Sequence, residues 1–305
     1  MAIVEEFPER LRRRFRVRNP LLVNLLSEFF ATTLLLCAGT GIVLQHVLSE
    51  GKLNTWTHVH LGWGFLVALC VYGTFKTSGG HMNPAVSLAM CTLGKLSLVH
   101  FFYYSIVQTI AAFLGSGLTY WAYADQIQNF TGGIRTITGN KATAGLFCSF
   151  PKEHISHSSA FLDQVIGTAL LCLFIAAIID KRNKIPTGLQ PLFFGLGLFV
   201  VGSSYGMMLG NPINPARDFG PRLFAFVFGG YGWEVFSYHN YYFWIPIVAP
   251  LFGGPLGVWL YQLFVGIHIP DDTPSNLGLM DLPTLEVNGI KSSCSELEPL
   301  SENGA

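Results

Sequence analysis

The sequence predicts an all-α membrane protein with six transmembrane helices and two re-entrant half-helices arranged as an inverted repeat. Three observations predict this class. Half of the 305 residues are hydrophobic and only 12% are charged, about half the charge density of an ordinary soluble domain. Six neutral apolar stretches are long enough to cross a bilayer, and the tripeptide Asn-Pro-Ala occurs twice on shorter apolar segments.

The spans are set by length, because a helix needs roughly 20 mainly apolar residues to cross the hydrocarbon core. Two further apolar segments, 83–94 and 214–229, are too short or too interrupted to cross. Each of these is predicted to be a re-entrant half-span, with its irregular backbone buried in the protein. The six predicted spans are 21–45, 58–75, 98–122, 161–179, 190–209 and 243–267.

The distribution of basic residues predicts the orientation. Six arginines lie between residues 10 and 18, before the first span, and short cytoplasmic flanks carry an excess of Lys and Arg. With that end inside and six crossings, both termini are predicted to be cytoplasmic. The predicted domains are a basic N-terminal segment 1–20, a membrane domain 21–270 and a mobile cytoplasmic tail 271–305. Within the membrane domain, the repeats 21–123 and 161–269 are joined by an extracellular loop, 124–160.

The second half of the chain repeats the first. Glu28 and Gln164 are each followed by Thr four residues later and by Leu seven residues later. Gly64 and Gly195 each lie 19 residues before the Asn of their own Asn-Pro-Ala copy. Because each copy has three crossings, an odd number, the two half-spans enter from opposite sides and place a shared site near the midplane.

The two tripeptides, Asn83-Pro84-Ala85 and Asn214-Pro215-Ala216, each predict a helix start, since Asn is a preferred N-cap and Pro is favoured at the first helical position. Two helix N-termini would then meet at mid-membrane, each with about +0.5 of an elementary charge. Such a junction opposes cations and protons and offers amide donors to a neutral solute. The backbone before each half-helix is expected to be extended, with conformational freedom supplied by Gly79, Gly80, Gly206 and Gly210.

With these motifs, the chain resembles the major intrinsic protein family, and within it the aquaglyceroporins. The resemblance covers roughly residues 21–269 and is carried by residues 78–85 and 214–222. Asp218, Arg222, Pro250 and Leu251 match the glycerol-conducting branch rather than the water-selective branch. The resemblance implies an aquaporin-like fold and a passive plasma-membrane channel in the lipid bilayer. It also implies a homotetramer, with water, glycerol and other small neutral solutes such as urea as the conducted molecules.

The resemblance also implies an outer selectivity constriction formed by Trp63, Gly202, Asn211 and Arg217. Bacterial glycerol facilitators commonly carry an aromatic residue where Asn211 stands, so the constriction of this chain has Trp63 as its one aromatic side chain. Gly202 is expected to leave the opposite wall vacant. Two alternatives stay open: Trp63 as an ordinary packing residue, and Arg217 as a structural side chain tied to loop carbonyls.

Other polar residues have separate expected roles. Glu28 and Gln164 are expected to be scaffold residues that accept hydrogen bonds from loop N–H groups, with proton coupling by Glu28 as the alternative. His81 is a candidate pH-sensing group on the cytoplasmic approach, with a hydrogen-bonded scaffold role as its alternative. Asp218 is expected to shape its loop and to pair with Arg222. Asn129 begins an N-x-Thr acceptor for N-glycosylation.

Several function classes are excluded by the same sequence. The net charge of zero gives no case for nucleic-acid binding, and the six cysteines show no metal or redox spacing, so no cofactor is expected. No nucleophile, base and orienting group converge, which argues against an enzyme. A water-selective channel and an ion-coupled inverted-repeat transporter remain as alternatives. The transporter is the weaker of the two because the span interiors hold almost no titratable groups besides Glu28.

Overall fold

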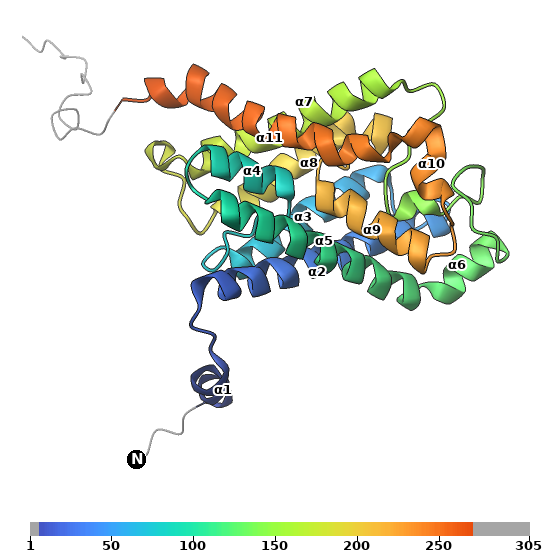
Figure 1. The fold of residues 1–305 in the computed structure, drawn as a ribbon, viewed down its shortest axis with the longest axis horizontal. Helices are drawn as coiled ribbons and strands as arrows, with labels where there is room; N and C mark the ends of the chain where they lie inside the picture. Colours follow the sequence, from blue (N-terminus) through green and yellow to red (C-terminus); the bar gives the residue numbers. More distant parts are fainter. Residues whose placement is uncertain (1–5, 271–305) are drawn as a thin grey trace, which may run out of the picture. The chain divides into compact units, whose positions relative to one another are not determined.

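The structure is a computed structural model that describes residues 6–270. The predicted cytoplasmic tail, 271–305, lies outside the described residues. The described residues form helices and contain no strand, which confirms the predicted all-α class. In Figure 1, α2 (Pro20–Leu48) begins and α11 (Ile245–Phe264) ends at the same end of the helix bundle, as expected for an even number of crossings.

Six long helices and two short ones make up the bundle. Five apolar segments, which contain α2, α5, α7, α8 and α11, are long and apolar enough to cross a membrane. The sixth long helix, α3, is long enough to cross but less apolar than the others, because His58 and His60 lie in its first turns. The long helices are α2 (Pro20–Leu48), α3 (Trp56–Thr74), α5 (Leu98–Ala122), α7 (His157–Ile179), α8 (Gln190–Leu209) and α11 (Ile245–Phe264), and the half-helices are α4 (Pro84–Thr92) and α9 (Pro215–Val227).

Three short helices lie outside the predicted spans. The segment 124–160, expected to be a loop, begins with α6 (Ala124–Thr131), which buries Ile127 and Thr131. The N-terminal segment contains α1 (Phe7–Phe15), and α10 (Glu234–Tyr241) precedes the last long helix. Single 3₁₀ turns occur at Ala144–Leu146, Lys181–Asn183, Tyr242–Trp244 and Gly266–His268.

The two repeats interlock through their half-helices. Within the first repeat α2 packs against α5, and the equivalent pair in the second repeat is α7 and α11. The half-helix α4 of the first repeat packs extensively against α11 of the second, and α9 packs in the same way against α5. Each half-helix is therefore supported by the opposite repeat, so both halves are needed to complete either one.

The contact between α3 and α8 depends on the glycine pair from the repeat pattern. A Cβ on Gly64 would lie 2.7 Å from the carbonyl oxygen of Gly195, and a Cβ on Gly195 would collide with the carbonyl oxygen of Gly64. Only glycine permits two helix backbones to approach this closely. The two positions that the repeat register singled out therefore meet each other at the interface between the repeats.

Candidate functional site

A continuous cavity of about 430 Å³ runs between the repeats. Its lining extends from Asn24, Lys95 and Tyr104 past Asn83 and Asn214 to Trp56. The four residues expected at the outer constriction, Trp63, Gly202, Asn211 and Arg217, all line this cavity, as does His81. The two predicted asparagines at the helix starts and the four residues expected at the constriction therefore share one passage.

The two Asn-Pro-Ala segments meet at the middle of this passage. Asn83 is the N-cap of α4 and accepts a hydrogen bond from the Ala85 N–H, at 2.9 Å. Asn214 is the N-cap of α9 and accepts from the N–H groups of Ala216 and Arg217, both at 3.1 Å. Pro84 and Pro215 each occupy the first helical position. Two helix N-termini with their positive dipole ends thus lie at the cavity.

The loop in front of each half-helix is held by a buried side chain of the preceding long helix. Glu28, on α2, accepts from the N–H groups of His81 at 2.9 Å and Met82 at 2.7 Å. Gln164, on α7, accepts from the N–H of Ile213 at 2.9 Å. Both side chains are fully buried, so these bonds replace contacts with water that the loop N–H groups have lost.

The glycines near these loops differ in backbone conformation. Gly79, Gly80 and Gly210 have φ angles of +90°, +64° and +76°, a region that glycine adopts without strain. Gly206 does not share this role, because it lies inside α8 with helical backbone geometry. That expectation was wrong, since Gly206 lies within the predicted span 190–209, all of which forms α8.

Space beside Gly202 and Gly206 is filled by His60, a residue that the sequence did not single out. A Cβ on Gly202 would lie 2.7 Å from Nδ1 of His60, and a Cβ on Gly206 would lie 2.7 Å from its Cε1. The wall at Gly202 was expected to be vacant, and that expectation was wrong. The wall is formed by the His60 imidazole, which also lines the cavity. A contact between α3 and α8 has no signal in the local pattern of either helix.

Arg217 contacts both a loop and an aromatic ring. Its Nη1 donates to the carbonyl oxygen of Phe147 at 2.8 Å, and its Cζ lies 5.1 Å from the ring centroid of Trp63. Within residues 6–270 the guanidinium makes no other hydrogen bond, although it carries five N–H donors. Arg217 therefore combines a structural bond with donors that remain available to a solute in the cavity.

Trp63 and Asn211 line the same cavity as Arg217. The Trp63 ring lies over Gly39 of α2, where a Cβ would overlap the indole. Asn211 has a positive φ of 56°, and its buried Oδ1 has no hydrogen-bond partner among the described residues. This oxygen lies on the side of Gly167 of α7, where a Cβ would be 3.7 Å from it, and a buried acceptor without a partner is costly.

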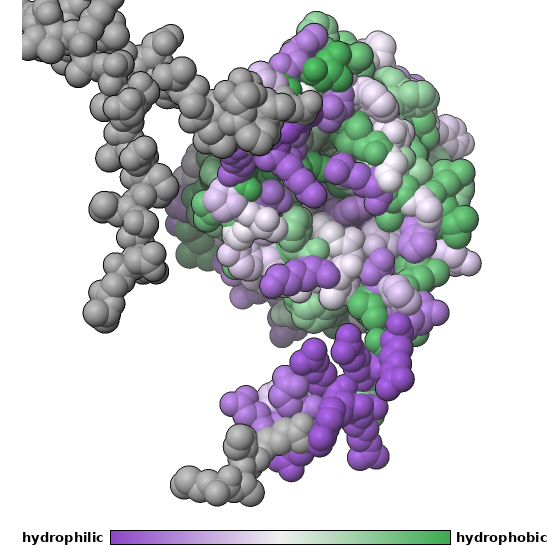
Figure 2. Space-filling view, turned by 90° about the vertical axis from the view of Figure 1, so that its left-hand side faces the viewer, coloured by the Kyte–Doolittle hydropathy of each residue, from purple (hydrophilic) through white to green (hydrophobic). Residues whose placement is uncertain are grey.

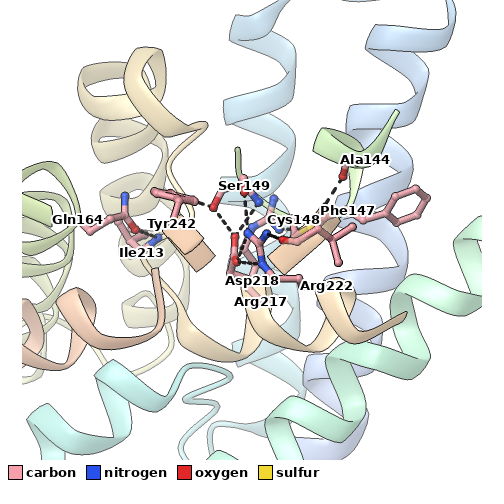
Figure 3. A network of polar contacts seen from close by, with 11 residues as sticks. Ala144, Phe147, Cys148, Ser149, Gln164, Ile213, Arg217, Asp218, Arg222 and Tyr242 are labelled. Carbon is pink, nitrogen blue, oxygen red and sulfur yellow. Dashed lines mark hydrogen bonds and ion pairs between the residues drawn. The ribbon is translucent and has the colours of Figure 1, made fainter. Parts of the chain in front are cut away.

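The residues after Arg217 form a buried network behind the passage (Figure 3). Arg222 pairs with Asp218, with Nη2 2.7 Å from Oδ1, and both side chains are nearly fully buried. Arg222 also donates to the carbonyl oxygens of Val235 and Ser149, at 2.7 and 2.6 Å. Asp218 in turn accepts from the Ser149 N–H at 2.7 Å. The pair therefore fixes the outer connection over α9, and neither residue lines the cavity.

The remaining predicted residues lie away from the cavity or at its inner half. Pro250 is buried inside α11 and Leu251 beside it is half-buried. His81 lines the cavity, and its Nδ1 lies 3.1 Å from Oγ of Ser87. Asn129 is exposed on α6. Within residues 6–270 no group of three or more His, Cys, Asp or Glu side chains could hold a metal ion.

Known proteins are similar to this chain over both repeats. The family described as Major intrinsic protein matches residues 17–261. The chain is 42% identical to aquaporin-10 of Homo sapiens over 97% of this chain and 96% of that protein. It is 39% identical to aquaporin-9 of Mus musculus over 87% of this chain and 90% of that protein. The solved aquaglyceroporin from Plasmodium falciparum gives a TM-score of 0.72 at 28% identity, covering 80% of this chain and 97% of that one.

Proposed function

The chain belongs to the major intrinsic protein family, and from this premise we propose which of its residues select the solute. It is a multi-pass membrane protein and a passive channel for water and glycerol, not an enzyme. The predicted fold class and function are thereby confirmed. Membership of the family does not assign a role to each side chain along the passage. These roles are proposed from where each side chain lies.

The observation that carries the assignment is the pair of capped helix starts at one cavity. Each half-helix directs its positive end toward the passage, so a cation or a hydronium meets an unfavourable field. A neutral solute meets no such barrier and can accept hydrogen bonds from Asn83 and Asn214. These two residues are therefore proposed as the central filter, with Pro84, Ala85, Pro215 and Ala216 fixing the geometry of the helix starts.

The outer constriction is proposed to recognise both sides of a polyol. Arg217 supplies N–H donors to hydroxyl oxygens, and Asn211 adds a polar side chain to the lining. The Trp63 indole covers the hydrocarbon edge of the solute. This combination of a donor, a polar lining and one aromatic face fits glycerol and also urea, whose carbonyl oxygen accepts hydrogen bonds. Asp218, Arg222, Pro250 and Leu251 are proposed to support these residues from behind.

Two alternatives are less favoured. A water-only pore needs no aromatic face, yet Trp63 lies at the wall beside Arg217. An ion-coupled transporter needs a titratable group that alternates between partners. Glu28 already accepts bonds from His81 N–H, Met82 N–H and Gln108 Nε2, the last at 2.8 Å. A carboxylate held by three donors is suited to a fixed scaffold role.

Assembly and location are proposed from the family and from topology. A homotetramer in the plasma membrane with one passage per subunit is consistent with the many large apolar side chains that the bundle leaves exposed, including Leu69, Tyr72 and Phe252. The basic segment before α2 supports cytoplasmic termini. In that orientation α6 is extracellular, so Asn129 is a proposed glycosylation site, and His81 faces the cytoplasmic half as a proposed pH-sensing group.

Stopped-flow light scattering on proteoliposomes tests the solute assignment. We expect rapid, non-saturating glycerol and water flux with a weak temperature dependence, unaffected by sodium or proton gradients. Empty liposomes measure the lipid background, and a sucrose gradient separates water flux from solute flux. Saturation of glycerol flux at millimolar concentration, or its dependence on an ion gradient, would favour the transporter. Water flux without glycerol flux would favour the water-selective pore.

A further inference from the structure

The helix α1 is a part of the described structure that the channel function does not use. It spans the nine residues Phe7–Phe15 and buries none of them. Its large apolar residues, Phe7, Leu11 and Phe15, recur at four-residue steps, which places them on one face of the helix. Their side chains are 64%, 42% and 67% exposed. The helix therefore presents an apolar stripe that the described residues do not cover.

Strong positive charge flanks this stripe. Six arginines and one glutamate lie between residues 7 and 18. Cζ of Arg10 lies 5.8 Å from the Phe7 ring centroid, and Cζ of Arg14 lies 5.5 Å from that of Phe15. In Figure 2 the surface of this segment is predominantly hydrophilic. Basic side chains beside an exposed apolar face are typical of helices that lie in a membrane interface.

A short connection joins α1 to the membrane-spanning part of the chain. Only residues 16–19 separate it from Pro20, where α2 begins. Asn19 fixes that start, because its side chain accepts from the Leu22 N–H at 3.2 Å. Four extended residues reach at most about 14 Å, and the polar layer on each side of a bilayer is roughly 5–8 Å thick. The connection thus keeps α1 within reach of the headgroups.

We propose that α1 lies flat on an anionic leaflet, with Phe7, Leu11 and Phe15 inserted between lipid chains and its arginines on the headgroups. The partner is a bilayer that contains a negatively charged phospholipid such as phosphatidylserine, whose phosphate and carboxylate groups match guanidinium donors. The apolar stripe accounts for insertion into the bilayer, and the arginines account for the preference for negatively charged lipids. In the proposed orientation of the chain, this is the cytoplasmic leaflet, where anionic lipids are concentrated.

The test uses the full chain in lipid nanodiscs, with hydrogen exchange of residues 10–16 followed by mass spectrometry. The amides of Arg10 and Arg16 are bonded within α1, to the carbonyl oxygens of Glu6 and Arg12. We expect these amides to exchange about tenfold more slowly in discs containing phosphatidylserine than in phosphatidylcholine discs. About 0.5 M salt should remove most of the difference, because it screens exposed charges. Nanodiscs expose both leaflets, so the result does not depend on the proposed orientation.

Two variants separate the apolar and the charged contributions. The double variant Leu11→Arg with Arg12→Leu keeps composition and net charge but moves the apolar side chain off the stripe, and it should lose protection in both lipids. The triple variant Arg12→Gln, Arg13→Gln and Arg14→Gln keeps the stripe and should lose only the dependence on phosphatidylserine. Glycerol flux at the wild-type rate shows that the bundle is folded in both.

Three outcomes would overturn the proposal. Equal exchange in the two kinds of disc shows that charge is not recognised. Equal protection in the Leu11→Arg, Arg12→Leu variant shows that the stripe is not inserted. Protection of the same size in detergent micelles shows that α1 packs on its own protein. A specific protein partner, by contrast, would leave α1 unprotected in every lipid and detergent sample, which also contradicts binding to lipid.

Discussion

Asn83 and Asn214 bond reciprocally to the loops of the opposite repeats. Nδ2 of Asn83 donates to the Ile213 carbonyl oxygen at 3.0 Å, and Nδ2 of Asn214 donates to the Met82 carbonyl oxygen at 2.8 Å. Each amide nitrogen carries two hydrogens, so one joins the repeats and the other is left for the cavity. The same two side chains therefore cap the half-helices, hold the halves together and line the cavity.

Replacing Asn214 by Asp should admit protons. The carboxylate keeps the capping acceptor but loses the bond to Met82 and places a negative charge between the two positive helix ends. We expect measurable proton flux into proteoliposomes that contain a pH-sensitive dye, with reduced thermal stability. Because the repeats are related by symmetry, Asn83→Asp should behave alike, whereas the exposed Asn129→Asp should not. Proton flux at the wild-type level in both cavity variants would contradict the proposed filter.

Replacing Glu28 by Gln should destabilise the first half-helix. The carboxylate accepts from three N–H donors, and an amide can accept on one atom only, so at least one buried donor loses its partner. The expected cost is about 1–3 kcal/mol, seen as a lower midpoint in thermal unfolding of the purified protein. The exposed Glu234→Gln makes the same chemical change and should be nearly neutral. If the variant is as stable as the wild type, Glu28 does not support the loop through these bonds.

His81 is predicted to make glycerol flux depend on internal pH. Its ring lines the half of the cavity that is proposed to face the cytoplasm, close to Tyr104 and to the loop that Glu28 holds. Burial lowers the pKa of the His81 imidazole and the nearby Glu28 carboxylate opposes this, so the ring gains its positive charge only on acidification, and that charge would reorient the ring and its loop. Glycerol flux of the wild type should differ between internal pH of about 5.5 and about 7.5, while His81→Ala should show no difference. Equal wild-type flux at the two values would remove the prediction.

Asn129 is predicted to carry an N-glycan when the chain is expressed in eukaryotic cells. The residue is exposed on α6, but Thr131 of the acceptor is buried and its Oγ1 donates to the Ile127 carbonyl oxygen at 2.8 Å. Attachment must therefore precede the folding of α6. Glycosidase treatment should increase the mobility of the wild type in gel electrophoresis and leave Asn129→Gln unchanged. A wild type that does not shift would count against both the glycan and the external placement of α6.

The long helices were predictable because each is a single apolar run. Residues 98–122 and 190–209 match α5 and α8 at both ends. The short helices α1 and α6 were missed because amphipathic segments of eight or nine residues do not stand out by apolar length. Their signal was periodicity, such as the four-residue spacing of Phe7, Leu11 and Phe15, which a search for uniform apolar stretches does not detect.

The helix starts in the site were predictable for a different reason. Asn-Pro-Ala carries its own local geometry, since the cap and the first turn are set by neighbouring residues. The role of His60 was not predictable in this way. It depends on α3 and α8 approaching each other, and that approach depends on Gly64 and Gly195, which belong to different repeats. Side chains placed by contacts between distant helices leave little trace in a single local pattern.

Substitutions at Gly202 test the outer constriction most directly. A side chain there must displace the His60 ring, because even a Cβ would lie 2.7 Å from Nδ1. Gly202→Phe should therefore push His60 and the new phenyl ring into the passage and abolish glycerol flux. Water flux should fall less, because water is narrower than glycerol. Both are measured by stopped-flow light scattering on proteoliposomes, normalised to the amount of reconstituted protein.

The double variant Gly202→Ala with His60→Ala supplies the matched control. Gly202→Ala alone adds one methyl group against the imidazole and should reduce glycerol flux, because a packed wall has no free volume for it. Removing the imidazole should restore that flux, and His60→Ala alone should raise flux and weaken discrimination between glycerol and larger polyols. If Gly202→Phe conducts glycerol at the wild-type rate, the constriction does not lie at Gly202. If Gly202→Ala is inhibited equally with and without His60, the imidazole is not the wall opposite Arg217.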